Sequence, residues 1–394
     1  MKEGWEYKKL GDIGTFIRGG NFSKKDFVED GFPCIHYGQI HMKFGVETLR
    51  SISSVPAEMV KNDRCAKKGD LVIAITSEDD AGSCKCTAWM GDYDVYVGGH
   101  TAIYRHTMQP KYVSYYFMSP YFQKDKLEYT HGFKVVEISP KDIAKISIPV
   151  PPLSEQKTIV DYLDSAFAKI DAMKANAEKR LNEAKALFQA SLKKMLEPKE
   201  GWEEKKLGDV GTFIRGGNFS KKDFVEDGYP CIHYGQIHTK FGVATFEHLS
   251  CVPETMVKKE RCASKGDLVI AITSEDDEGS CKCTAWMADY DAYVGGHTAI
   301  FKHNLNPIYV SYYFKAARFQ KDKLDYTHGF KVVEISPKDI AKIPVFYPSA
   351  EEQQSIVETL DSLKSKVDRL QENYEKISQE CDALKQAILR QVFE

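Results

Sequence analysis

The sequence contains no run of apolar residues approaching the roughly 20 that a helix needs to cross a bilayer. Its opening ten residues, MKEGWEYKKL, hold no apolar core of signal-peptide length. We therefore expect a cytoplasmic protein without a membrane partner. A strong charge of one sign is missing as well, since the net charge is −3 over 394 residues. This argues against a nonspecific polyanion binder, so any binding to nucleic acid must use a local face.

Short motifs of several enzyme classes are also missing. The chain has no Walker loop GxxxxGK[ST], no GxSxG elbow and no HExxH zinc motif. It lacks both the Asp/Asn-Pro-Pro-Tyr/Phe run of amino-methyltransferases and their glycine-rich cofactor loop. These absences favour a non-catalytic chain with no catalytic residues and no cofactor, and an enzyme is kept as an alternative.

The ten cysteines show no second pair of ligands at zinc-finger spacing. Cys84 and Cys86 are two positions apart, with His36 and His41 nearby in the sequence, so a zinc site is one interpretation of this segment. The interpretation that we favour is a reduced protein that uses cysteine as a small buried residue. We therefore expect no metal site.

The feature that the sequence does have is a tandem duplication. The segment RGGNFSKKDFVEDG occupies residues 18–31 and returns at residues 215–228. Residues 2–146 align with residues 199–343 without a gap, and 116 of the 145 positions are identical. The two copies therefore share one fold and, we expect, one ligand.

Within a copy, the pattern predicts a mixed and strand-rich domain. The apolar runs at residues 70–75 and 96–104 predict buried strands, because turn residues bound them. Within the second run, GGHT at residues 98–101 predicts a bend or bulge. HYGQIH, residues 36–41, is interpreted as a further strand, with Tyr37, Gln39 and His41 on one face. A short helix is expected to begin near Pro110 and, in the second copy, near Pro307.

The segment that follows each copy is different in kind, since it has no glycine and predicts one long helix. From Ile356 to Ile388 apolar residues recur in alternating steps of four and three, the heptad pattern of a helix that packs on another. The first segment begins in the same register and slips after Ala177, which is a stutter. The two predicted seams include Met173 and Leu384. We predict that the two helices pack together, the alternative being two independent surface helices.

The predicted fold class is α+β: two strand-rich domains alternate with two long helices that pair as an antiparallel coiled coil, and a pseudo-two-fold axis relates the halves. The predicted boundaries are residues 1–150 for the first domain, 151–198 for the first helical spacer, 199–348 for the second domain and 349–394 for the second spacer.

Taken together, four stretches resemble the specificity subunits of type I restriction–modification enzymes. They are the opening GWEYKKLGDIGTFIRGG, the run GDLVIAITSED followed by VGGHTAI, the run HGFKVVEISPKDIAKISIPVPPLSEQKTIVDYLD, and the long helix that follows. The second copy repeats all four, with PSAEEQQSIVETLD in place of PPLSEQKTIVDYLD. The resemblance covers essentially the whole chain, and its strongest part is the Ile-Pro, Pro, Glu-Gln, Ile, Leu-Asp run that enters each helix.

The resemblance implies a non-catalytic subunit whose two target-recognition domains each read one half of a split DNA sequence, while the helical spacers set the distance between the halves. It implies double-stranded DNA, two adenine-N6 methyltransferase subunits and, in the full enzyme, restriction subunits as partners. Family members commonly carry two dissimilar recognition domains. Here the domains are near-copies, so we infer an interrupted palindrome as the target. The alternatives are a coiled-coil scaffold with duplicated protein-binding modules and a duplicated zinc enzyme.

Sequence-specific DNA binding needs cationic and hydrogen-bonding side chains on loops that reach phosphates and base edges. Five stretches of the first copy supply them: RGGNFSKK, HYGQIH, TSEDD, GGHT and HGFK. Gly19 and Gly20 permit a tight turn or a close approach to DNA, and Gln39 suits a bidentate contact with adenine. Each stretch also has a structural interpretation as a solvated turn or a core-and-surface strand, and His100 as a core histidine.

The candidate DNA-binding residues of the two copies are Arg18, Asn21, Ser23, Lys24, Lys25, Gln39, His41, Thr76, Ser77, His100, His131, Lys134, Arg215, Asn218, Ser220, Lys221, Lys222, Gln236, His238, Thr273, Ser274, His297, His328 and Lys331.

Overall fold

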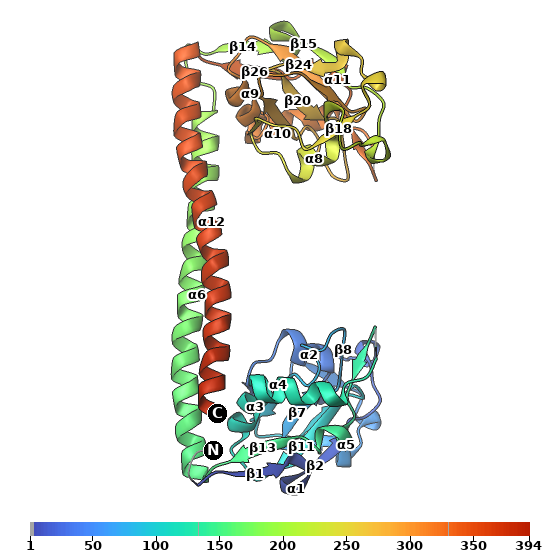
Figure 1. Ribbon diagram of the computed structural model, residues 1–394, viewed down its shortest axis with the longest axis vertical. Helices are drawn as coiled ribbons and strands as arrows, with labels where there is room; N and C mark the ends of the chain where they lie inside the picture. Colours follow the sequence, from blue (N-terminus) through green and yellow to red (C-terminus); the bar gives the residue numbers. More distant parts are fainter. Residues whose placement is uncertain (1–3, 133, 330) are drawn as a thin grey trace. The chain divides into compact units, whose positions relative to one another are not determined.

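The computed structural model describes residues 4–132, 134–329 and 331–394. The chain divides into two compact units. Unit 1 consists of Met1–Glu178 together with Tyr374–Glu394, and unit 2 consists of Lys179–Asn373. Each unit therefore combines one copy of the duplication with a part of both long helices, α6 (Leu153–Met195) and α12 (Ala350–Phe393) (Figure 1).

The other described elements of unit 1, with η for short 3-10 helices, are β1 (Glu6–Lys9), α1 (Leu10–Ile13), β2 (Gly14–Arg18), η1 (Lys24–Asp26), β3 (Phe32–Ile35), α2 (Tyr37–Met42), β4 (Glu47–Thr48), β5 (Ser53–Val55), η2 (Ala57–Met59), η3 (Asn62–Arg64), β6 (Cys65–Ala66), β7 (Leu71–Ala74), β8 (Thr76–Ser77), β9 (Cys86–Trp89), β10 (Val95–Val97), β11 (Thr101–His106), α3 (Pro110–Met118), α4 (Pro120–Asp125), η4 (Lys126–Tyr129), β12 (Val136–Glu137), α5 (Pro140–Ile143) and β13 (Ser147–Val150).

Those of unit 2 follow in the same order and are β14 (Glu203–Lys206), α7 (Leu207–Val210), β15 (Gly211–Arg215), η5 (Lys221–Asp223), β16 (Tyr229–Ile232), α8 (Tyr234–Thr239), β17 (Ala244–Thr245), β18 (Ser250–Val252), η6 (Glu254–Met256), η7 (Lys259–Arg261), β19 (Cys262–Ala263), β20 (Leu268–Ala271), β21 (Thr273–Ser274), β22 (Cys283–Trp286), β23 (Ala292–Val294), β24 (Thr298–His303), α9 (Pro307–Tyr313), α10 (Ala317–Asp322), η8 (Lys323–Tyr326), β25 (Val333–Glu334), α11 (Pro337–Ile340) and β26 (Pro344–Tyr347).

The centre of unit 1 is a five-stranded sheet with the strand order β2-β11-β7-β9-β4. Strand β7 is buried on both faces, because Leu71 and Ile73 join the core on the α3 side while Val72 and Ala74 join the core beneath α2. A strand covered on both sides is a continuous apolar run instead of an alternating one. The strand predicted from residues 70–75 is therefore confirmed, as is the helix beginning at Pro110.

A second sheet of unit 1 has the order β5-β3-β10-β6, and β3 and β10 run parallel. The run at residues 96–104 forms two strands, and the bend predicted at Gly98–Thr101 is confirmed, because the segment divides there between the two sheets. Strand β10 belongs to the four-stranded sheet, and β11 to the five-stranded sheet. Between them the chain turns at Gly98–His100, where Thr101 N donates to Gly98 O at 3.1 Å. The glycine pair thus carries the chain from one sheet to the other.

The strand predicted for HYGQIH is also wrong, because the structure places a helix, α2, there. His36 caps this helix: its Nδ1 accepts from Gly38 N at 3.2 Å, and its own backbone N–H donates to Gln39 Oε1 at 2.9 Å. Such reciprocal capping satisfies backbone donors at a helix start. In the helix Tyr37 and His41 are four residues apart on one side, with ring centroids 6.0 Å apart.

The long helices α6 and α12 pack together within each unit, as predicted. In unit 1, Lys385 Nζ donates to Asp171 Oδ1 at 2.5 Å, and Lys174 pairs with Asp382 at 3.5 Å. In unit 2, Lys185 Nζ donates to Gln371 Oε1 at 2.8 Å. Within the described residues, no helix is long and apolar enough to cross a membrane.

Two positions of the predicted seams are wrong. Met173 is 58% exposed and Leu384 is 47% exposed. Their neighbours in the sequence, Lys174 and Lys385, make the contacts instead, and the ammonium of Lys385 also lies 5.1 Å from the Phe167 ring centroid. A lysine can cover apolar surface with its stem while its ammonium pairs at the rim, and a purely apolar heptad count misses this.

The end of α12 is part of the core of the first domain. Leu389 and Phe393 are buried, and the Phe393 ring lies 5.4 Å from Tyr112 and 5.3 Å from Tyr116 between centroids. In unit 2 the end of α6 takes the equivalent place, where Leu192 and, directly after the helix, Leu196 join the core. The core of each domain is therefore completed by the end of a long helix that lies outside that domain's own stretch of sequence: α12 for the first domain and α6 for the second.

We predict that Phe393→Ala lowers the free energy of unfolding by about 3–5 kcal/mol, because it removes a buried ring and leaves a cavity. Urea unfolding followed by circular dichroism measures this change. Leu187→Ala is the matched control, because Leu187 on α6 is 59% exposed and its loss should cost less than about 0.5 kcal/mol. Equal effects of the two substitutions would contradict the role given to the helix end.

Candidate nucleic-acid interface

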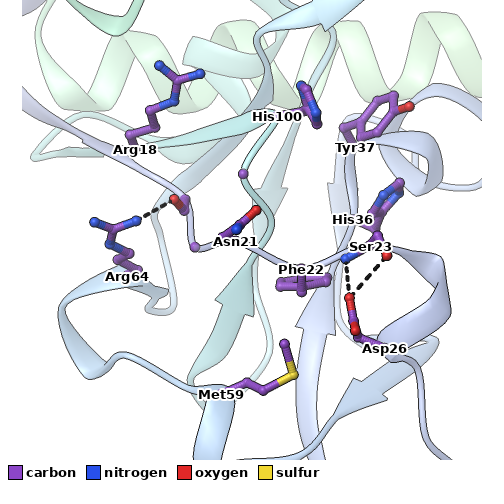
Figure 2. Close-up of a pocket in the computed structure, with 13 residues that line it drawn as sticks. Arg18, Asn21, Phe22, Ser23, Asp26, His36, Tyr37, Met59, Arg64 and His100 are labelled. Carbon is purple, nitrogen blue, oxygen red and sulfur yellow. Dashed lines mark hydrogen bonds between the residues drawn. The ribbon is translucent and has the colours of Figure 1, made fainter.

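A cleft of about 830 Å³ on unit 1 gathers four separate parts of the chain (Figure 2). Residues 18–23 form one wall, His36 and Tyr37 at the start of α2 form another, and Gly99 and His100 of the β10–β11 turn lie beside them. The remaining lining side chains include Met59 and Arg64. Three of the five stretches expected to contact DNA thus meet in one place.

The backbone of the RGG segment packs directly on the β10–β11 turn. Gly19 N donates to Thr101 O at 3.0 Å, and Gly20 N donates to Val97 O at 2.6 Å. A Cβ atom on Gly19 would lie 1.9 Å from Gly98 O, and a Cβ on Gly20 would lie 1.8 Å from the Tyr96 hydroxyl. Glycine is required here by close approach. The segment is therefore held rigidly, with its two glycines buried and Asn21 exposed.

Arg64 secures the same segment from the other side. Its Nη1 donates to Gly19 O at 2.9 Å (Figure 2). The equivalent Arg261 donates to Gly216 O at 3.0 Å in unit 2. Reasoning from the sequence missed this residue. The available signal was that Arg64 is kept in both copies although residues 62 and 63 just before it are substituted.

The remaining two stretches reach Arg18 through a small two-stranded sheet. Strand β8, which is Thr76 and Ser77, pairs with β12, and His131 forms a bridge to Glu137 on the same strand. Glu137 Oε1 accepts from Arg18 Nη2 at 3.2 Å. Arg18, the TSEDD stretch and the HGFK stretch are therefore neighbours, and Glu137 is a second residue that sequence reasoning missed.

Two candidate side chains of α2 are already engaged within the protein. Gln39 is 9% exposed; its Oε1 accepts from His36 N, and its Nε2 donates to Ser53 Oγ at 2.8 Å. His41 Nε2 lies 3.2 Å from Thr76 O. A bidentate contact between Gln39 and adenine would first have to break both hydrogen bonds of its amide.

Aromatic rings and histidines line one side of the cleft. The Tyr37 ring lies 4.4 Å from His36 and 5.2 Å from His100 between centroids. Burial lowers the pKa of His36, and the charges of Lys24 and His100 lower it further. A neutral His36 fits its role as the acceptor that caps α2, so its ring supports the structure of the wall, whereas His100 is exposed.

The two lysines that follow the RGG segment have exposed side chains. Ser23 accepts from Lys25 N at 3.3 Å and donates its hydroxyl to Asp26 Oδ2 at 3.0 Å, so it caps η1. Lys24 and Lys25 on η1 are exposed. Side chains with this exposure can reach phosphate oxygens without losing any hydrogen bond inside the protein.

The candidates thus fall into two sets. In unit 1 the side chains of one set are exposed and make no hydrogen bond or ion pair with any described residue; they are Asn21, Lys24, Lys25, His100, His131 and Lys134. The other set is buried or bonded within the protein, and comprises Arg18, Ser23, Gln39, His41, Thr76 and Ser77.

The cysteine segment shows the features of a packed core. Burial raises the pKa of Cys84 and of Cys86 to about 12, so both thiols stay protonated near neutral pH. Cys86 Sγ lies 3.7 Å from Ser114 Oγ. Across residues 4–132, 134–329 and 331–394, no three His, Cys, Asp or Glu side chains are grouped so that they could hold a metal ion.

The amino-acid sequence matches a known protein family. The family model of the type I restriction modification DNA specificity domain matches residues 2–183 and again residues 199–379. The chain is 23% identical over 419 residues to the type I restriction enzyme EcoKI specificity subunit of Escherichia coli K12, with 100% of this chain and 89% of that protein covered. It is 23% identical over 403 residues to the putative type I restriction enzyme MjaX specificity subunit of Methanocaldococcus jannaschii, with 96% and 91% covered.

Solved structures share the fold. A chain described under "Structural basis underlying complex assembly and conformational transition of the type I R-M system" superposes with a TM-score of 0.77 at 18% identity, covering 100% of this chain and 98% of that one. The HsdS subunit from Thermoanaerobacter tengcongensis gives a TM-score of 0.61 at 17% identity, with 100% and 97% covered. With two matches to the family model that together span nearly its whole length, the chain belongs to the family of type I restriction–modification DNA specificity proteins.

Proposed function

We propose that this chain is the DNA specificity subunit of a type I restriction–modification system and that its two domains read the same half-site. One observation supports the proposal that both domains read the same half-site. Every residue that lines the cleft of unit 1 has an identical counterpart in the second copy, from Arg18/Arg215 to His100/His297. Two domains with identical residues at these positions recognise the same bases, so the target is an interrupted palindrome.

The substitutions between the copies lie outside this cleft. Exposed residues of the segment between β4 and β5 differ most, where Leu49, Arg50 and Ile52 correspond to Phe246, Glu247 and Leu249. The surface of the domains has therefore changed while the lining of the cleft has not. This contrast supports the cleft as the part of each domain that holds the shared ligand.

The charges in and near the cleft favour DNA recognition through individual hydrogen bonds and ion pairs, and not through a general electrostatic attraction between protein and DNA. The chain carries a net charge of −3, and Glu137 pairs with Arg18 close to the cleft. Exposed Lys24, Lys25 and Lys134 supply local positive charge for phosphates. We propose that partner subunits provide the rest of the phosphate neutralisation.

We further propose the domain boundaries 1–150, 151–198, 199–348 and 349–394, with the helical spacers forming an antiparallel coiled coil about a pseudo-two-fold axis. The register of the contacts supports it. Asp171 of α6 pairs with Lys385 of α12, and Lys174, three residues later on α6, pairs with Asp382, three residues earlier on α12. The two helices therefore run in opposite directions. The pair Lys185–Gln371 of unit 2 continues the register, eleven forward against eleven back.

The proposal extends to the partners. By family membership, we propose that the chain binds double-stranded DNA together with two adenine-N6 methyltransferase subunits, that restriction subunits join in the full enzyme, and that the chain acts in the cytoplasm without catalysing a reaction itself. The solved relative with the higher TM-score comes from work on complex assembly of a type I system, which supports assembly with other subunits.

Methylome sequencing of cells with and without this chain tests the proposed function. We predict N6-methyladenine at one split motif whose two halves are the same sequence on opposite strands, and its loss on deletion. No motif lost on deletion would contradict the function. An asymmetric motif would contradict the shared half-site while leaving the specificity function in place.

Lys25 and Lys222 test the assignment of phosphate contacts. We predict that Lys25→Ala and Lys222→Ala weaken binding uniformly across DNA sequences and lower the slope of log affinity against log salt by about 1 each. Binding is measured by fluorescence anisotropy of the full chain with its methyltransferase subunits at several salt concentrations. Lys9→Ala is the matched control, because Lys9 is an exposed lysine of the same domain on β1. A change of base preference without a change in salt slope would contradict a phosphate contact.

A further inference from the structure

We infer that Asn21, and Asn218 in the second domain, read an adenine in each half-site by a bidentate contact in the major groove. This inference rests on the proposed function and adds to it the base and the side chain. It moves the adenine contact from Gln39, whose amide the protein already uses, to the carboxamide that stands free in the cleft.

The first argument is the free hydrogen-bonding capacity of Asn21. Figure 2 shows its side chain in the middle of the cleft, between Arg64 and His100. Asn21 is exposed, and its amide makes no hydrogen bond with any described residue. Most polar neighbours in the lining are engaged: Arg18 with Glu137, Arg64 with the Gly19 carbonyl, and Ser23 with Asp26.

The second argument is chemical. In the major groove adenine presents the N7 acceptor beside the N6 donor, so a single side chain that binds both must supply one donor and one acceptor. A carboxamide does this, whereas the ammonium of Lys24 or Lys25 can only donate. Asn21 is the one carboxamide among the residues that line the cleft.

The third argument is that the protein fixes the backbone on both sides of Asn21. On one side Gly20 N donates to Val97 O at 2.6 Å, and Arg64 holds the preceding carbonyl. On the other side Phe22 is 7% exposed, with its ring 5.3 Å from Tyr96 between centroids. Asn21 is thus an exposed residue between two buried anchors. Binding needs to immobilise only its own short side chain, which keeps the entropic cost low.

The second domain repeats each element of this arrangement. Gly217 N donates to Val294 O at 2.7 Å, Arg261 donates to Gly216 O at 3.0 Å, and Phe219 is 7% exposed. Asn218 is exposed, and its amide likewise makes no hydrogen bond with any part of the described chain. The inference therefore requires one adenine at the same position of both half-sites.

The test is base selection by the full chain in complex with its methyltransferase subunits, from a pool of duplexes with randomised positions. We expect the wild type to select a split sequence with an adenine at one matching position in each half. Asn21→Ala relaxes that position in one half only, and the double variant Asn21→Ala with Asn218→Ala relaxes it in both. The discrimination lost at each position is about 5- to 150-fold. Asn21→Asp is a near-isosteric second variant that also loses the adenine preference, because a carboxylate cannot donate to N7.

A modified base separates direct contact from a change in the shape of the cleft. Replacing the adenine in both half-sites with 7-deazaadenine removes the N7 acceptors, so binding to the wild type should weaken while binding to the double variant Asn21→Ala with Asn218→Ala changes no further. An equal loss for the two proteins overturns the contact. Selection of a split sequence that Asn21→Ala and Asn21→Asp leave intact in both halves overturns the inference but not the proposed function. A wild-type complex that selects no sequence overturns the function itself.

Discussion

The close packing of Gly19 and Gly20 on the turn between β10 and β11 is the contact on which the cleft depends. It leaves no room for a Cβ atom at either position, and the Arg64 guanidinium closes it from the other side. Because these contacts are made by backbone groups and one rigid cation, the loop has little freedom of its own. The residues that follow it, Asn21 above all, are presented by a surface that is already in place before a ligand arrives.

Gly19 and Gly20 can pack on this turn because it lies where the chain passes from the four-stranded sheet to the five-stranded sheet. The central strand β7 is buried on both faces, and β11 beside it carries the chain from the turn back into the five-stranded sheet. The small β8–β12 sheet brings Glu137 to Arg18. Hydrophobic burial thus fixes the scaffold, while directed hydrogen bonds and ion pairs decide which polar groups remain available. In a chain with so little net charge, this division favours readout of particular bases over general attraction to DNA.

Much of the scaffold could be predicted from the sequence, because its signals are local. The run at 70–75, the proline that begins α3 and the absence of glycine in the long helices each determine the element that forms there. The bend at Gly98–Thr101 could be predicted as well, because two adjacent glycines mark it. The strand predicted over residues 36–41 was wrong, because the hydrogen bonds of the His36 cap begin a helix there, and periodicity does not register such bonds. Met173 and Leu384 were misplaced because lysine stems cover part of the helix pair.

The candidate site was harder to predict. Its residues differ in whether their side chains already make hydrogen bonds within the protein, and this depends on the tertiary structure. Gln39 and Asn21 are equally suited to adenine by residue type, and only tertiary contacts separate them. Arg64 and Glu137 contact the loop and Arg18 across 45 and 119 positions of sequence, which no local motif reveals.

A structure of the chain bound, with its methyltransferase subunits, to a duplex that carries its target tests the central claim most directly. The account predicts that in each unit the segment Gly19–Lys25, or its counterpart at residues 216–222, lies against the major groove of one half-site, with the cleft facing the bases. DNA held on another face of the domains, with both of these segments open to solvent, would contradict it.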